Sequence, residues 1–194
     1  MRKSAPIIFA FIISQFQAQQ GAYYQQAAKY KMDIDVNAEK FTYQGKQTLE
    51  YTNNSPDELN VVYFHLYWNA FKPNSMMDQR VASQGKNGDG RLQKDAISRL
   101  ASIPKDQEGA QNIHWIKQNG KDLKFEVQET IMKVYLAEPI KPNSTTTFTM
   151  DWDSVIPQQI RRSGRNNREG VDMTMTQWYP KIAEYDYDGW ATFD

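Results

Sequence analysis

The sequence predicts an all-β fold, an antiparallel β-sandwich or saddle-like sheet, and three observations lead to that prediction. Apolar and polar residues alternate with a period of two in several segments, as in strands with one buried face. Turn signals rich in Asn, Gly and Pro separate these segments at short intervals. Hydrophobic residues make up 40% and aromatic residues 13% of the chain, which is enough to build a core. Short strands joined by regular turns are typical of sandwiches and related sheets.

The first expected strands follow one another closely. Residues Tyr30–Val36 alternate apolar and polar side chains and form the first. The second covers Phe41–Thr52, and we expect Gln44-Gly45 to break it. The third, Leu59–Trp68, is nearly all β-branched or aromatic, which indicates a strand covered on both faces.

A long polar stretch then interrupts the pattern. Residues 69–110 include a glycine-rich run at 84–90 and a candidate helix at 92–100, and we interpret them as an insertion in the β-domain. Strand patterning returns at 112–118, and Asn119-Gly120 is typical of a tight hairpin. Pro139 and Pro142 predict a further turn. The remaining expected strands lie at 123–127, 131–137, 145–156 and 173–179.

The N-terminus is typical of an export signal. Arg2 and Lys3 precede the apolar run Ala5–Ser14, which is too short for a membrane span of about 20 residues. We expect a signal peptide at 1–18, cleaved after Ala18, a leader at 19–29 and the β-domain at 30–180. This predicts an exported protein, periplasmic, secreted or on the outer surface, without a stable membrane span after cleavage. A buried N-terminal strand or helix is the alternative.

Composition excludes several kinds of chemistry. The 23 basic and 23 acidic residues leave no net charge, so nucleic acid is not an expected partner. The absence of cysteine rules out thiolate metal sites, disulfides and thiol nucleophiles. The two histidines, His65 and His114, are far apart and form no HExxH zinc pair, so we interpret both as structural. We therefore expect neither catalytic residues nor a metal site in this chain.

The last part of the chain is unusually aromatic. A run this dense needs another surface to cover it, because large apolar patches are rarely left in water. Trp and Tyr are enriched in interface cores, which favours an interdomain interface. The residues assigned to it are Trp178, Tyr179, Tyr185, Tyr187 and Trp190. The alternative is a stacking platform for sugars in an exported carbohydrate-binding module.

A possible calcium loop lies within the same run. The order Asp186-Tyr-Asp-Gly189 is similar to the start of a calcium-binding loop, but the further acidic ligands of that pattern do not follow. The same residues are also an ordinary turn sequence. We interpret them as a turn.

Four segments follow one another in a recognisable order: the opening strand Tyr30–Val36, the turn Phe41–Gly45, the apolar strand Leu59–Leu66 and the run Gln177–Lys181 (QWYPK). This order resembles the N-terminal β-domain of the M1 (gluzincin) zinc aminopeptidases. The last of the four segments is most similar to exported M1-type peptidases of Bacteroidetes. The resemblance extends over roughly Tyr30 to Asp194 and implies that residues 181–194 begin the connection to a catalytic domain.

The chain lacks the catalytic motifs of the family, and this decides what the resemblance implies for its function. The HExxH pair, the downstream glutamate ligand and the GxMEN-type loop of the family have no counterparts here. The resemblance therefore implies an N-terminal fragment, inactive alone, whose partner is the downstream catalytic domain of the same polypeptide. The zinc would reside there, none would be bound by this chain, and the parent would hydrolyse peptides from the amino end.

The family also holds the free amino group of its peptide substrate with a Gln-x-Glu pair ahead of this run. The nearest equivalent is Asn167-x-Glu169, which stands further from the Tyr-Pro pair and has Asn in place of Gln. The resemblance implies that Asn167 and Glu169 contact the peptide, and a carboxylate suits an ammonium group. The surrounding loop, Arg161–Gly170, is charged enough for an exposed Glu169 to be ordinary.

Overall fold

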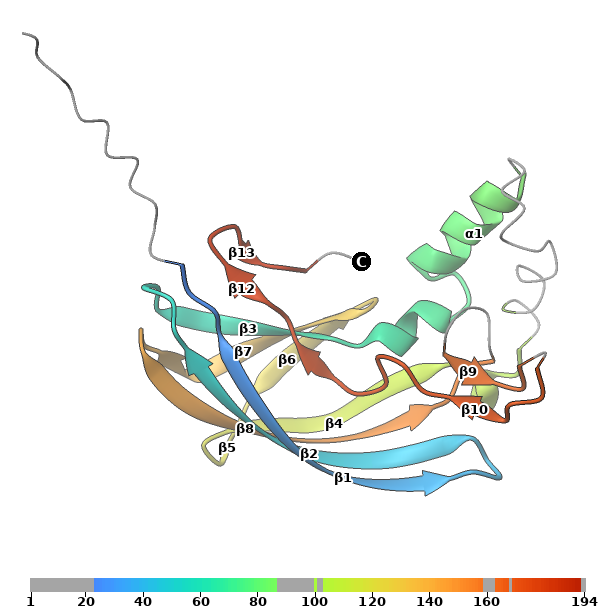
Figure 1. Cartoon of the computed structure of the whole chain (residues 1–194), viewed down its shortest axis with the longest axis horizontal. Coiled ribbons are helices and arrows are strands. Elements are labelled where there is room, and N and C mark those ends of the chain that lie inside the picture. Colours follow the sequence, from blue (N-terminus) through green and yellow to red (C-terminus); the bar gives the residue numbers. More distant parts are fainter. Residues whose placement is uncertain (1–22, 87–99, 101–102, 159–162, 168, 193–194) are drawn as a thin grey trace, which may run out of the picture.

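The computed structural model describes residues 23–86, 100, 103–158, 163–167 and 169–192. It confirms the all-β class, because antiparallel sheets make up most of the described chain (Figure 1). The predicted signal peptide and the candidate helix at 92–100, apart from Leu100, lie outside the described residues. Within the described ranges, no helix combines the length and the apolar character that crossing a membrane requires.

The larger sheet has five strands in the order β1-β2-β8-β4-β5 and is strongly curved (Figure 1). Its strands are β1 (Ala27–Asn37), β2 (Thr42–Asn53), β4 (Ala110–Gln118), β5 (Lys121–Asp122) and β8 (Ser144–Val155). In β2, buried residues alternate with exposed ones from Tyr43 to Tyr51. One face of the sheet therefore faces the core and the other faces solvent, as the period of two predicts.

Strand β2 does not break at Gly45, so the predicted break there is wrong. Gly45 pairs in register with Ile34 of β1 and with Trp152 of β8. A Cβ atom at position 45 would lie 2.3 Å from the ring of Trp152, which is fully buried. The glycine is thus required because it makes room for a tryptophan, and its strand continues.

The second sheet has the order β11-β3-β7-β6 and packs against the concave face of the larger one (Figure 1). Its strands are β3 (Leu59–His65), β6 (Lys124–Gln128), β7 (Ile131–Ile140) and β11 (Lys181–Ile182). Strand β7 runs through Pro139, where the sequence predicts a turn. Pairing passes from Val61–Tyr135 to Leu59–Ile140 with a shift in register, which leaves the proline out of the ladder.

The hydrophobic core lies between the two sheets. Phe64 of β3 meets Phe148 of β8 edge to face, with ring centroids 6.2 Å apart. Removal of these side chains from water is the main favourable term in folding. The largest fully buried side chains are Trp68, Trp152, Tyr43, Tyr51, Phe64, Phe148, Leu49, Leu66, Leu100, Ile116, Met132 and Ile140.

Residues 69–110 begin inside this core. The short helix η1 (Tyr67–Phe71) buries Trp68 and Asn69. The Asn69 side chain accepts a hydrogen bond from the Gln111 N–H (2.9 Å), which ties η1 to β4. Helix α1 (Met76–Lys86) and the 3-10 turn η2 (Lys105–Gln107) follow, and α1 projects from one end of the sandwich (Figure 1).

Two small hairpins complete the fold. They are formed by β9 (Gly164–Arg165) with β10 (Met173–Thr174), and by β12 (Tyr185–Asp186) with β13 (Gly189–Trp190). The strand predicted at 173–179 is therefore regular only at its first two residues. Gln177 has φ 52°, a left-handed conformation that does not continue a strand.

Candidate functional site

The Trp-Tyr-Pro run lies in a segment that crosses the sheets and that we call the anchored segment (Thr176–Ala183). The Trp178 carbonyl accepts hydrogen bonds from the Tyr43 hydroxyl and from Gln111 Nε2 (2.8 Å). The Pro180 carbonyl accepts one from Gln47 Nε2 (3.2 Å). These three donors come from strands β2 and β4, and they satisfy carbonyls that regular strand pairing would otherwise satisfy.

Further main-chain groups of the anchored segment are paired with side chains and, at strand β11, with the main chain of β3. The Ile182 N–H donates to the Tyr30 hydroxyl of β1 (2.9 Å), and the Ala183 N–H donates to the Tyr63 carbonyl of β3 (2.8 Å). Trp68 Nε1 donates to the Thr176 carbonyl (3.1 Å). The segment is thus bonded to both sheets and to η1 along its whole length.

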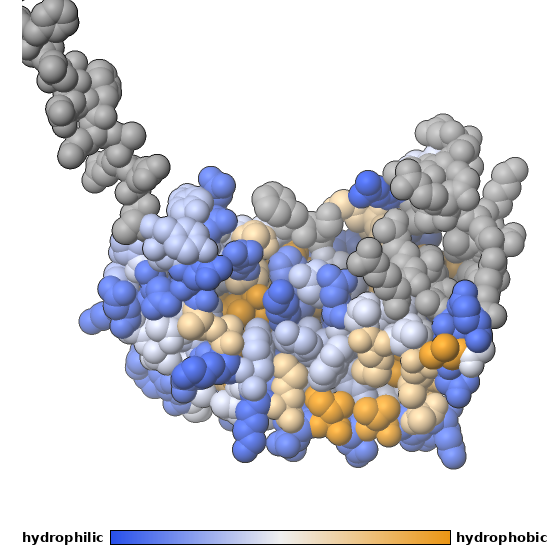
Figure 2. Space-filling view, in the orientation of Figure 1, coloured by the Kyte–Doolittle hydropathy of each residue, from blue (hydrophilic) through white to orange (hydrophobic). Residues whose placement is uncertain are grey.

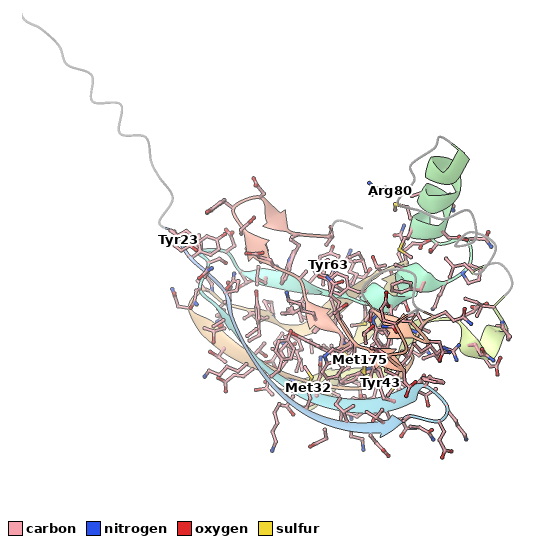
Figure 3. All side chains as sticks on the ribbon, turned by 45° about the vertical axis from the view of Figure 1, so that its right-hand side comes forward. Tyr23, Met32, Tyr43, Tyr63, Arg80 and Met175 are labelled. Carbon is pink, nitrogen blue, oxygen red and sulfur yellow. The ribbon has the colours of Figure 1, made fainter. Side chains whose placement is uncertain are left out.

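Aromatic rings add to this attachment. Trp178 meets Tyr43 edge on (5.9 Å between centroids), and Tyr179 meets Tyr30 edge on (5.3 Å). Both Trp178 and Tyr179 are half-buried against the core of the chain itself. Tyr43 belongs to the buried core, and Met32 and Met175, which Figure 3 also labels, pack against that core.

The buried tyrosines stay protonated at neutral pH. Burial raises the pKa of Tyr43 to about 12. Burial also raises the pKa of Tyr30 and of Tyr51 well above the usual value. A neutral hydroxyl is what the Tyr43 bond to the Trp178 carbonyl requires, because a phenolate has no proton to donate.

The second aromatic group is the terminal hairpin (Tyr185–Trp190). The Trp190 ring contacts Tyr51 (6.4 Å between centroids, 27° between planes), Tyr63 (5.9 Å) and Tyr185 (5.1 Å). Tyr187 is different: 68% of it is exposed, and its ring meets only the edge of Tyr24 (6.0 Å) among the ring contacts of the described residues.

The turn of this hairpin is built by Asp186 and Gly189. Asp186 Oδ1 accepts the Asp188 N–H (2.9 Å), and Gly189 has φ 91°, so the Asp-Tyr-Asp-Gly run forms a turn. Tyr185 Oη donates to Asp57 (2.9 Å), and burial together with this bond raises the pKa of Tyr185 to about 12. No three His, Asp or Glu side chains in the described part of the chain are placed to hold a metal ion.

The predicted substrate residues lie in the loop between β9 and β10, which we call the rim loop (residues 166–172). Asn167 Oδ1 accepts the Val171 N–H (2.6 Å), and the Asn167 N–H donates to the Val171 carbonyl (3.3 Å), so Asn167 closes the loop. Glu169 is exposed near the tip. The two residues thus share one loop but differ in role: Asn167 shapes the loop, and the Glu169 carboxylate faces solvent.

Arg165, at the base of the rim loop, is buried, which the sequence did not indicate. Arg165 Nη2 donates to the carbonyl and to Oε1 of Gln107 (3.4 and 3.1 Å), and the guanidinium lies 5.2 Å from the centre of the Phe41 ring. Burial lowers the pKa of Arg165. In sequence it stands in a charged run where nothing distinguishes it from Arg161 and Arg162, so only the fold identifies it as the residue that fixes the loop.

The two histidines lie in separate places. His65 is buried and stacks on Tyr67, with centroids 4.8 Å and planes 8° apart. His114 lies on the outer face of the larger sheet, at a bulge in β4, with Nε2 2.5 Å from Asp153 and Nδ1 3.7 Å from Asp151. The stack and the aspartates give each histidine a local structural contact.

No protein-family model matches the chain, and no curated protein matches it. Solved structures that resemble it include a two-domain M1 zinc metallopeptidase variant bound to L-tryptophan (13% identity, 80% of this chain, TM-score 0.46). A variant bound to L-arginine (12%, 79%, TM-score 0.47) and the M1 zinc metallopeptidase from Deinococcus radiodurans (12%, 79%, TM-score 0.46) are also similar. The chain covers 26–27% of those chains, about a quarter of their length.

Proposed function

We propose that this chain is the N-terminal substrate-cleft and scaffold domain of an exported M1-type zinc metallopeptidase. The order of the strands and the run Gln177–Lys181 support this through their resemblance to that family. The observation that carries the proposal is the anchoring of Trp178 and Pro180, whose carbonyls are held by Tyr43, Gln47 and Gln111. A run held this firmly can serve as a fixed wall for a second domain.

The half-buried aromatic residues suit such an interface. Trp178, Tyr179 and Trp190 each rest on the sandwich with one side and keep part of their surface exposed, and Tyr187 is mostly exposed. Large aromatic side chains that are already held in one conformation lose little entropy when a second surface covers them. We assign that surface to the downstream catalytic domain of the same polypeptide, which would hold the zinc.

The rim loop supplies the candidate contact with substrate. Glu169 is an exposed carboxylate on a loop whose base is fixed by Arg165 and whose turn is closed by Asn167. A carboxylate in this position would receive the free ammonium group of a peptide through a charge-assisted hydrogen bond. Peptide hydrolysis from the amino end is the activity that this arrangement serves.

Assembly with the downstream region tests the domain assignment. The chain and the region encoded after it, expressed separately and mixed, should form a 1:1 complex by light scattering, and the mixture should hydrolyse an aminoacyl anilide. Replacing Tyr187 or Trp190 with Ala should weaken the complex. No complex, or a chain that retains a polysaccharide through Trp190, would contradict the proposal.

The role of Glu169 has its own test in the assembled enzyme. Glu169→Gln should raise KM for a peptide with a free amino group by roughly 10- to 100-fold, because a hydrogen bond to a charged group contributes about 1.5–3 kcal/mol. The inhibition constant of an N-acetylated peptide, which lacks the ammonium group, should be unaffected. Glu39→Gln, which alters another exposed glutamate, is the matched control. Equal effects of the two substitutions would remove Glu169 from the site.

A further inference from the structure

Strand β1 forms an open edge of the larger sheet. Within the described residues it pairs only with β2, over eleven residues in unbroken register. In Figure 1 it runs from the upper left to the lower right, and its second half forms the lower margin of the molecule. The outer edge of such a strand presents N–H and C=O groups that can pair with another strand.

The side chains of β1 divide sharply between two faces. The even-numbered residues Tyr30, Met32 and Ile34 are half-buried, and Val36 is 44% exposed. The odd-numbered residues are charged and exposed: Lys29, Lys31, Asp33 and Asp35. Figure 2 shows apolar surface along the lower side of the molecule, where Figure 1 places this strand.

The order of charges along β1 is self-complementary. Two lysines precede two aspartates, and Met32 lies at the centre of the four. We infer that β1 pairs with β1 of a second copy of this chain, antiparallel and centred on Met32. Lys31 then faces Asp33 of the second copy, and Lys29 faces Asp35 of the second copy. Opposite charges directly across a strand pair are stabilising.

The apolar face agrees with the same register. Met32 faces Met32 of the second copy, and Tyr30 faces Ile34 of the second copy. Both pairs extend the apolar inner face of the sheet across the junction. Burial of apolar surface at the two-fold axis and four cross-strand charge pairs therefore occur in one arrangement, which is an isologous contact of the kind most soluble dimers use.

Neighbouring registers are unfavourable. A centre at Lys31 places that lysine opposite its own copy, and a centre at Asp33 does the same with an aspartate, so like charges meet. Sliding one strand along the other by a single residue places charged side chains opposite apolar ones, because side chains alternate between the two faces of the sheet. The register centred on Met32 is the one in which both faces match.

Contacts within the chain fit the charge pattern. Lys29 Nζ lies 2.7 Å from Glu50 of β2, and Asp33 is directly opposite Lys46 of β2. In the paired sheet, Lys29 would lie between Glu50 and Asp35 of the second copy. Charges can also guard an edge against pairing, and the experiments below distinguish a guarded edge from a self-complementary one.

Cysteine cross-linking tests the register, and the chain has no cysteine of its own. Directly opposed residues have Cα atoms about 4.5–5.5 Å apart, which a disulfide can bridge. Met32→Cys should therefore form a covalent dimer under mild oxidation. Lys29→Cys or Asp35→Cys alone should not, because each is six residues, about 20 Å, from its own copy. An equimolar mixture of these two variants should cross-link.

Charge reversal tests the pairing without a covalent bond. Lys31→Asp alone and Asp33→Lys alone each place two like-charged pairs in the dimer and should weaken it by roughly tenfold or more, measured by analytical ultracentrifugation. A mixture of the two variants should restore dimers, because the opposed charges again differ in sign. Lys124→Asp, an exposed reversal on β6, should change nothing.

The outcomes separate cleanly. Cross-linking of the mixture but not of its components, with dimers restored by mixing the charge variants, would establish the pairing. A chain that remains monomeric at the highest concentration reached, and a cysteine mixture that cross-links no faster than its components, would overturn it. Unchanged thermal unfolding of each variant shows that its fold is intact. The inference does not depend on the peptidase proposal.

Discussion

The anchored segment (Thr176–Ala183) and the terminal hairpin (Tyr185–Trp190) both contain Trp and Tyr but are held in different ways. In the anchored segment, side chains of the sheets bind main-chain carbonyls and N–H groups. The terminal hairpin instead rests on ring contacts around Trp190 and on one bond from Tyr185 to Asp57. Aromatic content alone therefore does not say whether a segment is a fixed part of the sandwich.

What distinguishes the anchored segment is a set of polar residues on the buried face of the larger sheet. Gln47 and Gln111 are 3% and 2% exposed, at positions where an apolar residue would be ordinary. Each lies where a carbonyl of the anchored segment needs a hydrogen-bond donor. Buried polar groups of this kind are costly without a partner, so they fix the path of the segment as well as its stability.

The largest loss of stability is expected when Gln111, which holds the anchored segment, is replaced. Its side chain donates to the Trp178 carbonyl (2.8 Å) and accepts the Trp68 N–H (3.2 Å). Gln111→Leu should lower the free energy of unfolding by about 3 kcal/mol, because the Trp68 N–H stays buried without a partner and the Trp178 carbonyl loses one of its two donors. The melting temperature should fall by roughly 2–4 °C for each kcal/mol. Gln44→Leu, on the exposed face of β2, is the control, and equal shifts for the two would contradict the anchoring.

A smaller effect is expected in the terminal hairpin. Trp190→Ala should cost about 2 kcal/mol, because a half-buried ring on Tyr51, Tyr63 and Tyr185 is lost. Tyr187→Ala should stay within about 0.5 kcal/mol, as for most exposed positions. Urea unfolding of both variants measures the difference. If Tyr187→Ala were the more damaging, the hairpin would be held by its tip, against the contacts described above.

Tyr43→Phe removes a single hydroxyl that holds the anchored segment. Loss of its bond to the Trp178 carbonyl should cost about 1 kcal/mol at neutral pH. The pKa of Tyr43 is raised to about 12 by burial, from the ordinary value near 10, so the unfolded chain loses this proton first. The stability of the wild type is therefore unaffected by this group below pH 10 and falls between pH 10 and 12 by about 1.4 kcal/mol per pH unit, which is more in total than the hydrogen bond contributes.

The alkaline dependence is measured by comparing urea unfolding of the two proteins between pH 9 and 12, roughly the range of tyrosine ionisation. The difference between wild type and Tyr43→Phe should shrink above pH 10 and reverse in sign at about pH 11, because only the wild type carries this ionisation. A difference that stays constant over this range would mean that the Tyr43 hydroxyl is not buried in the folded chain.

The sequence predicted the long strands well, because alternation directly reflects one buried face. The predictions for β1, β2 and β8 are each close to the observed bounds. It failed where the outcome depends on a residue distant in sequence. Strand β2 continues through Gly45 because Trp152 fills the space above this glycine. The residues Gln44-Gly45 alone carry no information about that distant tryptophan.

The candidate site shows the same division. The position of the Trp-Tyr-Pro run could be predicted as important, but its attachment depends on Tyr43 and Gln111, which are more than sixty residues away. The charged run Arg161–Gly170 predicts the loop that holds Asn167 and Glu169, whereas the closing role of Asn167 and the burial of Arg165 come from local turn geometry and from packing on Phe41.

Amide hydrogen exchange tests the central claim, that hydrogen bonds to the two sheets hold the anchored segment in place. The Ile182 N–H bonds to the Tyr30 hydroxyl, and the Ala183 N–H bonds to the Tyr63 carbonyl. In the isolated chain, both amides should exchange as slowly as those of the central strand β2, and the amide of Tyr187 should exchange orders of magnitude faster. Exchange of Ile182 and Ala183 as fast as that of Tyr187 would contradict the account.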